Sequence, residues 1–479
     1  MPSAAREWLL PLFVCGVMAC YAPLTTILLP AHILELSCHS TAAPCGSDAA
    51  TEAAGFWLEG SRSFVNFCAM LTLPAFTLVA DRWGRKPVLC ACVGSMALDA
   101  CASALAPSLS LVITLHSASG LVGSTWLFIA VACACCVDVM TTEVADRSGA
   151  FALIEAAVMT ALVVGPLSWG ALAQLIGNRL SMLAMSGALV VLLVLMVGLL
   201  PETLTPEHRA PPLRGTRALI AATHPAAPLT YLCTSHAVRI VALMMGCLWG
   251  AMRAMEYLFV PFASTEFGWG DAHLGAYTTS LSCAMVLSNI ILSARSAKRG
   301  DAHVLSQIGA GFATFACSLW ACISVLPRGR QGVMWAAALP YGMSMFMSPV
   351  LRARLSHVVP AGEQARALGC AAAIETVTAV LAPLAAGALL EACEEAGWAT
   401  SLSYLPSALL FLAIVPLSSL LERNVATTET WRPHALAEPL VSAIDADGAS
   451  SASGSHDVLS GPHPASETLT APGTLSQGT

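Results

Sequence analysis

Long apolar blocks alternate with short polar stretches along most of this chain. Most blocks are about twenty residues long, which is the length that a helix needs to cross ~30 Å of hydrocarbon. Read in this way, the pattern predicts twelve membrane-spanning helices, at residues 8–34, 56–79, 88–106, 110–137, 149–175, 180–200, 237–262, 273–293, 303–326, 332–351, 367–390 and 399–421. We therefore expect an all-α membrane protein.

The longest polar interruption divides these spans into two groups of six. We expect an N-terminal six-helix half at residues 1–200, a cytoplasmic linker at 201–236 and a C-terminal six-helix half at 237–421. Residues 422–479 are rich in Ser, Thr, Pro, Gly and Ala and have little to bury. They predict a disordered cytoplasmic tail.

The composition excludes an ordinary water-soluble fold. Of the 479 residues, 56% are hydrophobic and only 11% are charged, whereas soluble domains carry about 25% charged residues. The net charge of −7 indicates little about partners, because most of the surface would face lipid.

The basic residues indicate the orientation, since Lys and Arg collect on the cytoplasmic side of membrane proteins. Twelve spans with both termini in the cytoplasm place sixteen of the 22 basic residues on that side. These are Arg6, Arg82, Arg85, Lys86, Arg147, Arg209, Arg214, Arg217, Arg295, Lys298, Arg299, Arg352, Arg354, Arg366, Arg423 and Arg432.

The fifth and eleventh spans resemble each other, which suggests an internal duplication. Each begins with Arg and Gly, and each has an Ile-Glu pair whose acid, Glu155 or Glu375, lies six residues after Gly149 or Gly369. Repeated halves of this kind build transporters whose substrate site lies near the middle of the membrane.

The segment from Ala80 to Pro87, ADRWGRKP, carries four charges between two apolar spans. It resembles the signature loop between the second and third helices of the major facilitator superfamily, although Thr77 stands where that family usually has Gly. The segment Pro201 to Leu204, PETL, also resembles a recurring sequence of this family. The resemblance implies a twelve-helix transporter that works by alternating access.

The same segment predicts a gating loop. Gly84 permits a tight turn, Asp81 can accept hydrogen bonds from a helix N-terminus in the other half, and the loop cations can meet an acid at the end of span four. The residues concerned are Asp81, Arg82, Gly84, Arg85, Lys86 and Asp138. In the alternative interpretation, the cations only hold the loop in the cytoplasm.

Two narrower resemblances imply proton coupling, one by symport and the other by antiport. The strings around Glu155 and around Glu363 to Glu375 resemble the proton-coupled folate transporter group and its fungal and animal relatives. The segment Gly165 to Gly170, GPLSWG, resembles the glycine-proline signature of proton-antiporting exporters. Symport and antiport therefore both stay open.

Ionisable residues inside apolar spans are the candidates for chemistry, because burying an unpaired charge there is costly. A desolvated carboxyl group can exchange a proton near neutral pH, so we predict proton coupling at Glu155 and Glu375, with Asp99 and His116 as further candidates. The alternative is that these acids, hydrogen-bonded or protonated, only pack helices, and that His116 is a polar helix contact.

Two charged pairs are the candidates for substrate binding. Glu59 and Arg62 lie three residues apart in span two, and Arg253 and Glu256 lie three apart in span seven, so each pair shares one helix face. The arginines suit an anionic substrate, and Asn66 can add hydrogen bonds. Alternatively, each pair neutralises itself.

The sequence has no nucleotide-binding glycine loop and no metal-ligand cluster, so we expect no cofactor, no metal, no enzymatic activity and no nucleic-acid partner. A disulfide between Cys38 and Cys45 is possible in an oxidising compartment, but their spacing alone does not show it. We expect a secondary transporter of a small organic solute, coupled to protons, in the plasma membrane or an organelle membrane, without an obligate protein partner. The alternative is a non-transporting membrane sensor or assembly protein.

Overall fold

The structure, a computed structural model, describes residues 3–41, 48–122, 125–139, 144–210, 223–224, 227, 235–296, 302–326 and 329–427. All of them lie within one compact unit, residues 1–430. The regular secondary structure of the described residues is helical throughout. The expected tail beyond residue 427 and most of the expected linker lie outside the described residues.

The first half of the chain contributes eight α-helices and a π-helical turn. These are α1 (Ser3–Pro23), η1 (Leu24–Leu28), α2 (Leu29–Thr41), α3 (Asp48–Trp83), α4 (Arg85–Leu105), α5 (Leu109–Ser119), α6 (Thr125–Val139), α7 (Val144–Ile176) and α8 (Asn178–Leu199). A short 3₁₀ turn, η2 (Pro206–His208), follows.

The second half is built in the same way. Its elements are α11 (His236–Phe267), α12 (Asp271–Ser296), α13 (Ala302–Ala321), η3 (Ile323–Val325), α14 (Arg330–Ser344), α15 (Met347–His357), η4 (Ala361–Glu363), α16 (Gln364–Glu395), η5 (Thr400–Tyr404) and α17 (Leu405–Thr427).

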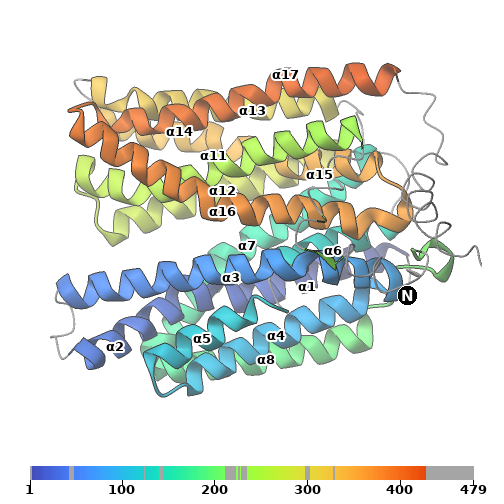
Figure 1. The fold of residues 1–479 in the computed structure, drawn as a ribbon, viewed down its shortest axis with the longest axis horizontal. Helices are drawn as coiled ribbons and strands as arrows, with labels where there is room; N and C mark the ends of the chain where they lie inside the picture. Colours follow the sequence, from blue (N-terminus) through green and yellow to red (C-terminus); the bar gives the residue numbers. More distant parts are fainter. Residues whose placement is uncertain are drawn as a thin grey trace, which may run out of the picture. The chain divides into compact units, whose positions relative to one another are not determined.

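The helices run side by side in two groups, α1–α8 and α11–α17 (Figure 1). Helices α7, α3 and α6 carry most of the contact between the groups: α7 packs on α12 and α15, while α3 and α6 pack on α16. Most residues that link the two groups therefore lie on these six helices.

Ten helices of the described residues are long and apolar enough to cross a membrane. They match ten of the twelve expected spans. The other two expected spans, at 110–137 and 332–351, are not among these ten helices, and the count of twelve spans stays a prediction. The first is divided into α5 and α6, and the second into α14 and α15 with a turn at Met345 and Phe346. These are the fourth spans of the two halves, so the break recurs at the same place in each.

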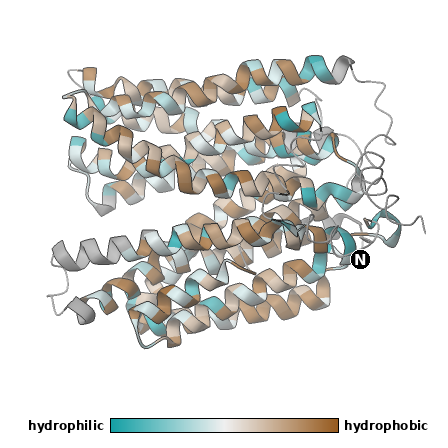
Figure 2. Ribbon diagram, viewed as in Figure 1, coloured by the Kyte–Doolittle hydropathy of each residue, from teal (hydrophilic) through white to brown (hydrophobic). Residues whose placement is uncertain are grey.

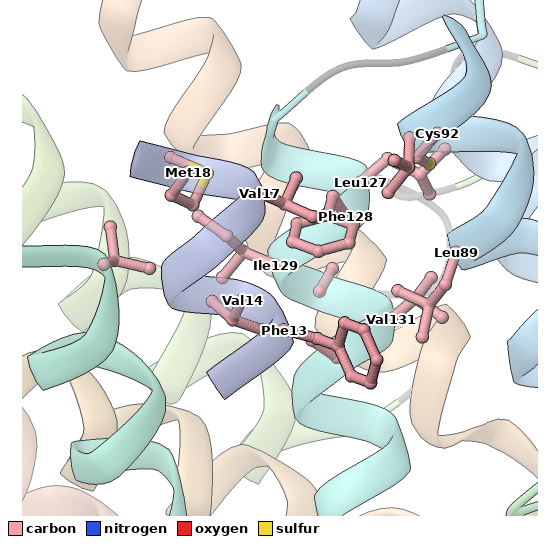
Figure 3. Packing of buried hydrophobic residues seen from close by; sticks show 14 of the residues in the cluster. Phe13, Val14, Val17, Met18, Leu89, Cys92, Leu127, Phe128, Ile129 and Val131 are labelled. Atoms are coloured by element: carbon pink, nitrogen blue, oxygen red, sulfur yellow. The ribbon is translucent and has the colours of Figure 1, made fainter. Parts of the chain in front are cut away.

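Each group of helices encloses its own apolar core. The first core consists mainly of residues between Leu10 and Leu200, and the second of residues between Val238 and Leu421. Figure 3 shows part of the first, where Val14 and Val17 of α1 pack near Phe128 of α6. Hydrophobic residues also cover much of the outer helix surfaces (Figure 2), as expected where the surrounding medium is lipid.

The first span contains a π-helical turn, η1, directly after Pro23. Proline lacks the N–H that continues the helical hydrogen-bond ladder, so nearby carbonyl groups need other donors. The hydroxyl groups of Thr25 and Thr26 both donate to the Ala22 carbonyl, at 3.0 Å. Arg62 of α3 donates to the Thr25 carbonyl at 2.8 Å. Arg62 thus stabilises an irregular part of the first span.

Close helix packing in the first half depends on Gly165 of α7. A Cβ atom at this position would lie 2.5 Å from the Ala19 carbonyl oxygen and 2.9 Å from Cγ of Pro23, both on α1. Gly170, further along α7, has more room, because a Cβ there would lie 3.7 Å from Ile27.

We expect Gly165→Ala to lower the free energy of unfolding by about 1–3 kcal/mol, because the added methyl group overlaps the α1 backbone. Gly170→Ala is the matched control on the same helix and should have little effect. Thermal unfolding of both purified variants in detergent tests this. Equal unfolding temperatures for the two variants would contradict the close contact between α1 and α7.

Candidate functional site

A buried arginine joins the two glutamates that the sequence comparison of spans five and eleven singled out. Arg352 of α15 is 4% exposed and pairs through Nη1 with Glu155 of α7. Its Nη2 donates to Glu375 of α16 at 2.7 Å. The Ser348 hydroxyl, one turn before Arg352, donates to Glu155 at 3.0 Å. We call Glu155, Arg352 and Glu375 the buried triad.

The structure places Arg352 and Arg354 inside a helix, although both lie past the expected end of the span at 332–351. Their assignment to the cytoplasmic side stays a prediction. Helix α15 continues to His357, and the side chains of both arginines are buried. Arg354 donates to the Ser418 hydroxyl at 3.0 Å and pairs with Glu422 of α17 at 3.1 Å. A hydrophobic window ends at Leu351 because two cations follow, yet both cations have acidic partners that make their burial possible.

The triad lies beside two tryptophans and a second arginine. The guanidinium carbon of Arg352 is 5.8 Å from the ring centroid of Trp249 on α11. Arg253, one turn further along α11, lies over Trp126 of α6 at 4.9 Å and over Trp249 at 5.5 Å. A small cavity here is lined by Trp126, Ala130, Arg352, Leu368, Ala372 and Glu375. Side chains of both halves therefore meet at one polar site between apolar walls.

The predicted substrate-binding residues do not form one site: Arg253 and Glu256 lie beside the triad, whereas Arg62 lies against the first span. Arg253 pairs with Glu256 beside the triad, as their spacing on one helix face suggests. Arg62 contacts η1 instead, and Asn66, one turn further along α3, is half-buried. The side chain of Glu59 lies outside the described residues.

Asp99 and His116 form a second buried polar cluster. The His116 ring nitrogen Nδ1 lies 3.0 Å from Asp99 Oδ2, and the Tyr21 hydroxyl donates to the same oxygen at 2.8 Å. Ser103 donates to Asp99 Oδ1 at 3.3 Å. All four side chains are buried and come from α1, α4 and α5. The cluster therefore lies wholly within the first half.

The gating loop connects the halves through Asp81. This residue lies in the last turn of α3 and accepts hydrogen bonds from the backbone N–H groups of Ala365 and Arg366, at 3.1 and 2.8 Å. These are the first N–H groups of α16, which have no acceptor within their own helix. A carboxylate at a helix N-terminus also interacts favourably with the helix dipole. We refer to this end of the molecule as the Asp81 end.

Other loop residues hold Asp81 in position. The buried Arg85 guanidinium pairs with Asp81 and donates through Nε to Asp138 at 3.1 Å. The loop turns at Gly84, whose φ of 128° favours glycine. Lys86 donates to the Val197 carbonyl near the end of α8 at 2.6 Å, and Arg82 is half-buried.

The segment PETL closes the N-terminus of α4. Glu202 accepts hydrogen bonds from the backbone N–H groups of Arg85 and Lys86, at 2.8 and 3.2 Å. Thr203 donates to Asp138 at 3.0 Å. Glu202 thus binds the N-terminal N–H groups of α4, as Asp81 binds those of α16.

A cation complements Asp81 at the neighbouring helix end. Arg147 of α7 donates through Nη1 to the Ser356 carbonyl, in the last turn of α15, at 2.9 Å. The first half therefore places a cation at the C-terminus of α15 and an anion at the N-terminus of α16. Both charges have the sign that stabilises the helix end they contact.

Thr77 fits against a glycine of the other half. A Cβ atom at Gly369 of α16 would overlap Cγ2 of Thr77 on α3. Position 77 holds Thr instead of the family's usual Gly, but the opposite helix has Gly369 at this contact. Helices α3 and α16 therefore still approach closely.

Several residues of the site escaped sequence reasoning, namely Arg352, Glu202, Tyr21, Trp126 and Trp249. One signal pointed to Arg352: two acids at matching positions of two apolar spans require a buried cation nearby. Glu202 lies in the segment PETL, which resembles a recurring family sequence, whereas Tyr21, Trp126 and Trp249 carry no local signal because their partners lie far away in the chain. Within the described residues, no group of three or more His, Cys, Asp or Glu side chains is placed to hold a metal ion. Cys38 is buried and Cys45 lies outside the described residues, so their disulfide stays a prediction.

Comparison with known proteins agrees with this architecture. A family model of the Major Facilitator Superfamily matches residues 57–383. The chain is 25% identical to the class C tetracycline resistance protein of Escherichia coli over 360 residues, which cover 72% of this chain and 82% of that protein.

Two solved structures show the same fold. The human organic anion transporter MFSD10 (TETRAN) superimposes with a TM-score of 0.71 at 17% identity, over 87% of this chain and 100% of that one. The proton:xylose symporter XylE, bound to 6-bromo-6-deoxy-D-glucose, superimposes with a TM-score of 0.65 at 14% identity, over 87% of this chain and 96% of that one.

We expect Asp81→Asn to increase hydrogen exchange at the Ala365 and Arg366 amides by about fivefold, because an uncharged acceptor binds them more weakly. Hydrogen-exchange mass spectrometry with overlapping peptides measures this. Glu202→Gln is the matched control and should affect the Arg85 and Lys86 amides instead. Unchanged exchange at 365 and 366 in Asp81→Asn would show that the carboxylate does not hold α16.

We expect Gly369→Ala to lower the free energy of unfolding by about 1–3 kcal/mol, and Thr77→Gly in the same chain to restore most of it. Thermal unfolding of the single and double variants measures this coupling. Gly246→Ala is the control, because a Cβ there would meet Ile374 of α16 at an ordinary 3.7 Å. Additive effects of the two changes would refute the fit between Thr77 and Gly369.

Proposed function

The chain belongs to the Major Facilitator Superfamily, and from this premise we propose that it is a secondary active transporter that couples movement of a small organic solute to protons. Family and fold are those of a multi-pass integral membrane transporter, and the absence of enzymatic activity stays a prediction. The proton coupling, the alternating-access mechanism and the site residues are our proposal.

The observation that carries the proposal is the composition of the buried triad. One arginine lies between two carboxylates, and all three side chains are almost completely buried. With both acids ionised the group would hold a net charge of −1, which is costly inside a membrane protein. One bound proton makes it neutral. Cys133 of α6 and Arg253 of α11 are further ionisable groups near the triad.

The triad also divides between the two halves. Glu155 belongs to α7, whereas Ser348, Arg352 and Glu375 belong to α15 and α16. A movement of the halves that opens the Asp81 end would separate Glu155 from Arg352 and leave Arg352 paired with Glu375. That remaining pair is neutral, so Glu155 must carry the proton to be neutral as well. We therefore propose Glu155 as the residue that carries the proton during the conformational change.

The solved relatives support this proposal through the fold they share with this chain. One is a proton:xylose symporter and another is an organic anion transporter. The charge balance of the triad serves symport and antiport equally, so both directions stay in the proposal. Membership of the folate transporter group stays a prediction.

The other site residues have different expected roles. Asp99 and His116 lie within one half, so a movement between the halves would leave their cluster intact, and we propose that they position α1, α4 and α5. The substrate-binding role of Arg62 with Glu59 and Asn66 stays a prediction. The gating loop would open when Asp81 leaves α16 and Arg147 leaves α15.

We expect Glu155→Gln to abolish solute accumulation driven by a pH gradient but to preserve solute exchange across the membrane. A permanently neutral side chain permits the conformational change but cannot release a proton. Glu375→Gln should lose both activities, because Arg352 then has no partner once Glu155 moves away. Vesicles containing the purified protein, screened with a panel of solutes with and without an imposed pH gradient, measure both activities.

Glu266→Gln is the matched control, since Glu266 pairs with Arg330 of α14 away from the triad. Both activities should be retained in this variant. If Glu155→Gln and Glu375→Gln left pH-driven accumulation unchanged, the proton assignment would be wrong. A wild-type protein that moves no solute under either condition would favour the non-transporting alternative.

A further inference from the structure

Three side chains beside the triad form a cluster that proton coupling does not require. Trp126 of α6 and Trp249 of α11 meet edge to face across the two halves, with ring centroids 5.6 Å apart. The Arg253 guanidinium covers both rings, at 4.9 and 5.5 Å from their centroids. We infer that this cluster binds a planar aromatic anion, whose ring stacks on Trp126 and whose carboxylate bonds to Arg253 and to the Trp249 N–H. This inference rests on the proposed transport function and names its substrate class.

Two buried hydrogen-bond donors of the cluster indicate an acceptor-bearing ligand. Trp249 is 5% exposed, yet its indole Nε1 has no hydrogen-bond partner in the part of the chain that the structure describes. The same holds for Nε of Arg253. A buried donor without an acceptor costs about 1–3 kcal/mol. A carboxylate is the group that best satisfies an indole N–H and a guanidinium together.

A small cavity beside the cluster has apolar walls on part of its surface. Trp126 lines it together with Ala130, Leu368 and Ala372, and the charged side chains of Arg352 and Glu375 complete the lining. The cavity has room for about one water molecule, so a ligand ring must widen it. The planar guanidinium of Arg253 already stacks on the Trp126 ring. An aromatic ring of a ligand can pack on the Trp126 ring beside this guanidinium, because aromatic pairs and guanidinium groups both favour the faces of indole rings.

The cluster is reached from the end opposite the Asp81 end. Trp249, Arg253 and Glu256 follow one face of α11 at successive turns, and α11 begins near the Asp81 end, where His236 lies 3.2 Å from Asn424 of α17. Exposure of the side chains rises along this face, from the buried Trp249 through Arg253 at 20% to Glu256 at 53%. The contacts of Asp81 and Arg147 close the other end.

The charges near the cluster favour an anion that replaces Glu256. The carboxylates of Glu155 and Glu375 are already bound by Arg352. The side chain of Glu256 is more than half exposed, so it is free to turn away from Arg253 when a ligand carboxylate binds there. A substrate carboxylate takes over the buried side of Arg253, and the net charge beside the triad stays the same.

Binding of 1-naphthoate to the purified full-length protein, measured by titration calorimetry at constant pH, tests the inference. The wild type should bind 1-naphthoate about fivefold more tightly than the saturated decahydronaphthoate, because only the planar ring stacks. It should bind 1-naphthylmethylammonium more weakly still, because Arg253 repels a cation.

Variants separate the contributions of the three side chains. Trp249→Phe keeps an aromatic ring but removes the N–H, and should weaken naphthoate binding by about tenfold. Arg253→Met and Trp126→Leu should weaken it as well, the second only for the planar ligand. Trp335→Phe is the matched control, because Trp335 belongs to a different aromatic cluster with Trp269 and Tyr277. Only variants whose unfolding temperature in detergent equals that of the wild type are compared.

The inference is overturned if the stable wild type binds no naphthoate, if it prefers the cation, or if Trp249→Phe and Arg253→Met bind like the wild type. These outcomes are independent of the transport assays. Glu155-dependent accumulation of another solute without naphthoate binding would refute the inference alone. Naphthoate binding that depends on Trp249, together with accumulation indifferent to pH and to Glu155→Gln, would refute the proton coupling alone.

Discussion

One buried cation forms ion pairs with acids of both halves. Arg352 requires acidic partners in its apolar surroundings, and it finds them only where α7 of the first half meets α15 and α16 of the second. The interaction is therefore both a packing contact and a charge balance. Separation of the halves changes the number of unpaired charges, and a proton can compensate that change. In the proposed mechanism, protonation and conformation are linked at this site by the cost of burying charge.

The contacts at the Asp81 end act on the same two helices. Asp81 binds the N-terminus of α16, Arg147 binds the C-terminus of α15, and Gly369 of α16 accommodates Thr77. Gln364, in the turn between these helices, donates to the Ser356 and Val359 carbonyls at 2.9 and 2.8 Å. The helix pair α15–α16 is thus held as one piece. Release of its end at Asp81 and release of Arg352 from Glu155 would require the same movement.

Much of the fold could be predicted from hydrophobic block length, but the two broken spans could not. Residues 110–137 and 332–351 are apolar enough to be continuous helices, yet the structure divides them between α5 and α6 and between α14 and α15. Arg352 lies past the expected end of a span because a hydrophobicity window stops at a cation, whereas in the structure it is buried with two acidic partners. Those partners come from other helices, so the local sequence does not show that this arginine is buried.

The sequence by itself determined where helices form, which acids lie inside them, and that the loop at Asp81 connects two spans. Block length and the cost of a buried charge are local properties, so they can be recognised without neighbours. Only the tertiary structure decided which groups meet. Glu155 and Arg352 are 197 residues apart in the chain, and Asp81 and Arg366 are 285 apart. Such pairs depend on which helix faces touch, and that is determined by the packing of the whole bundle.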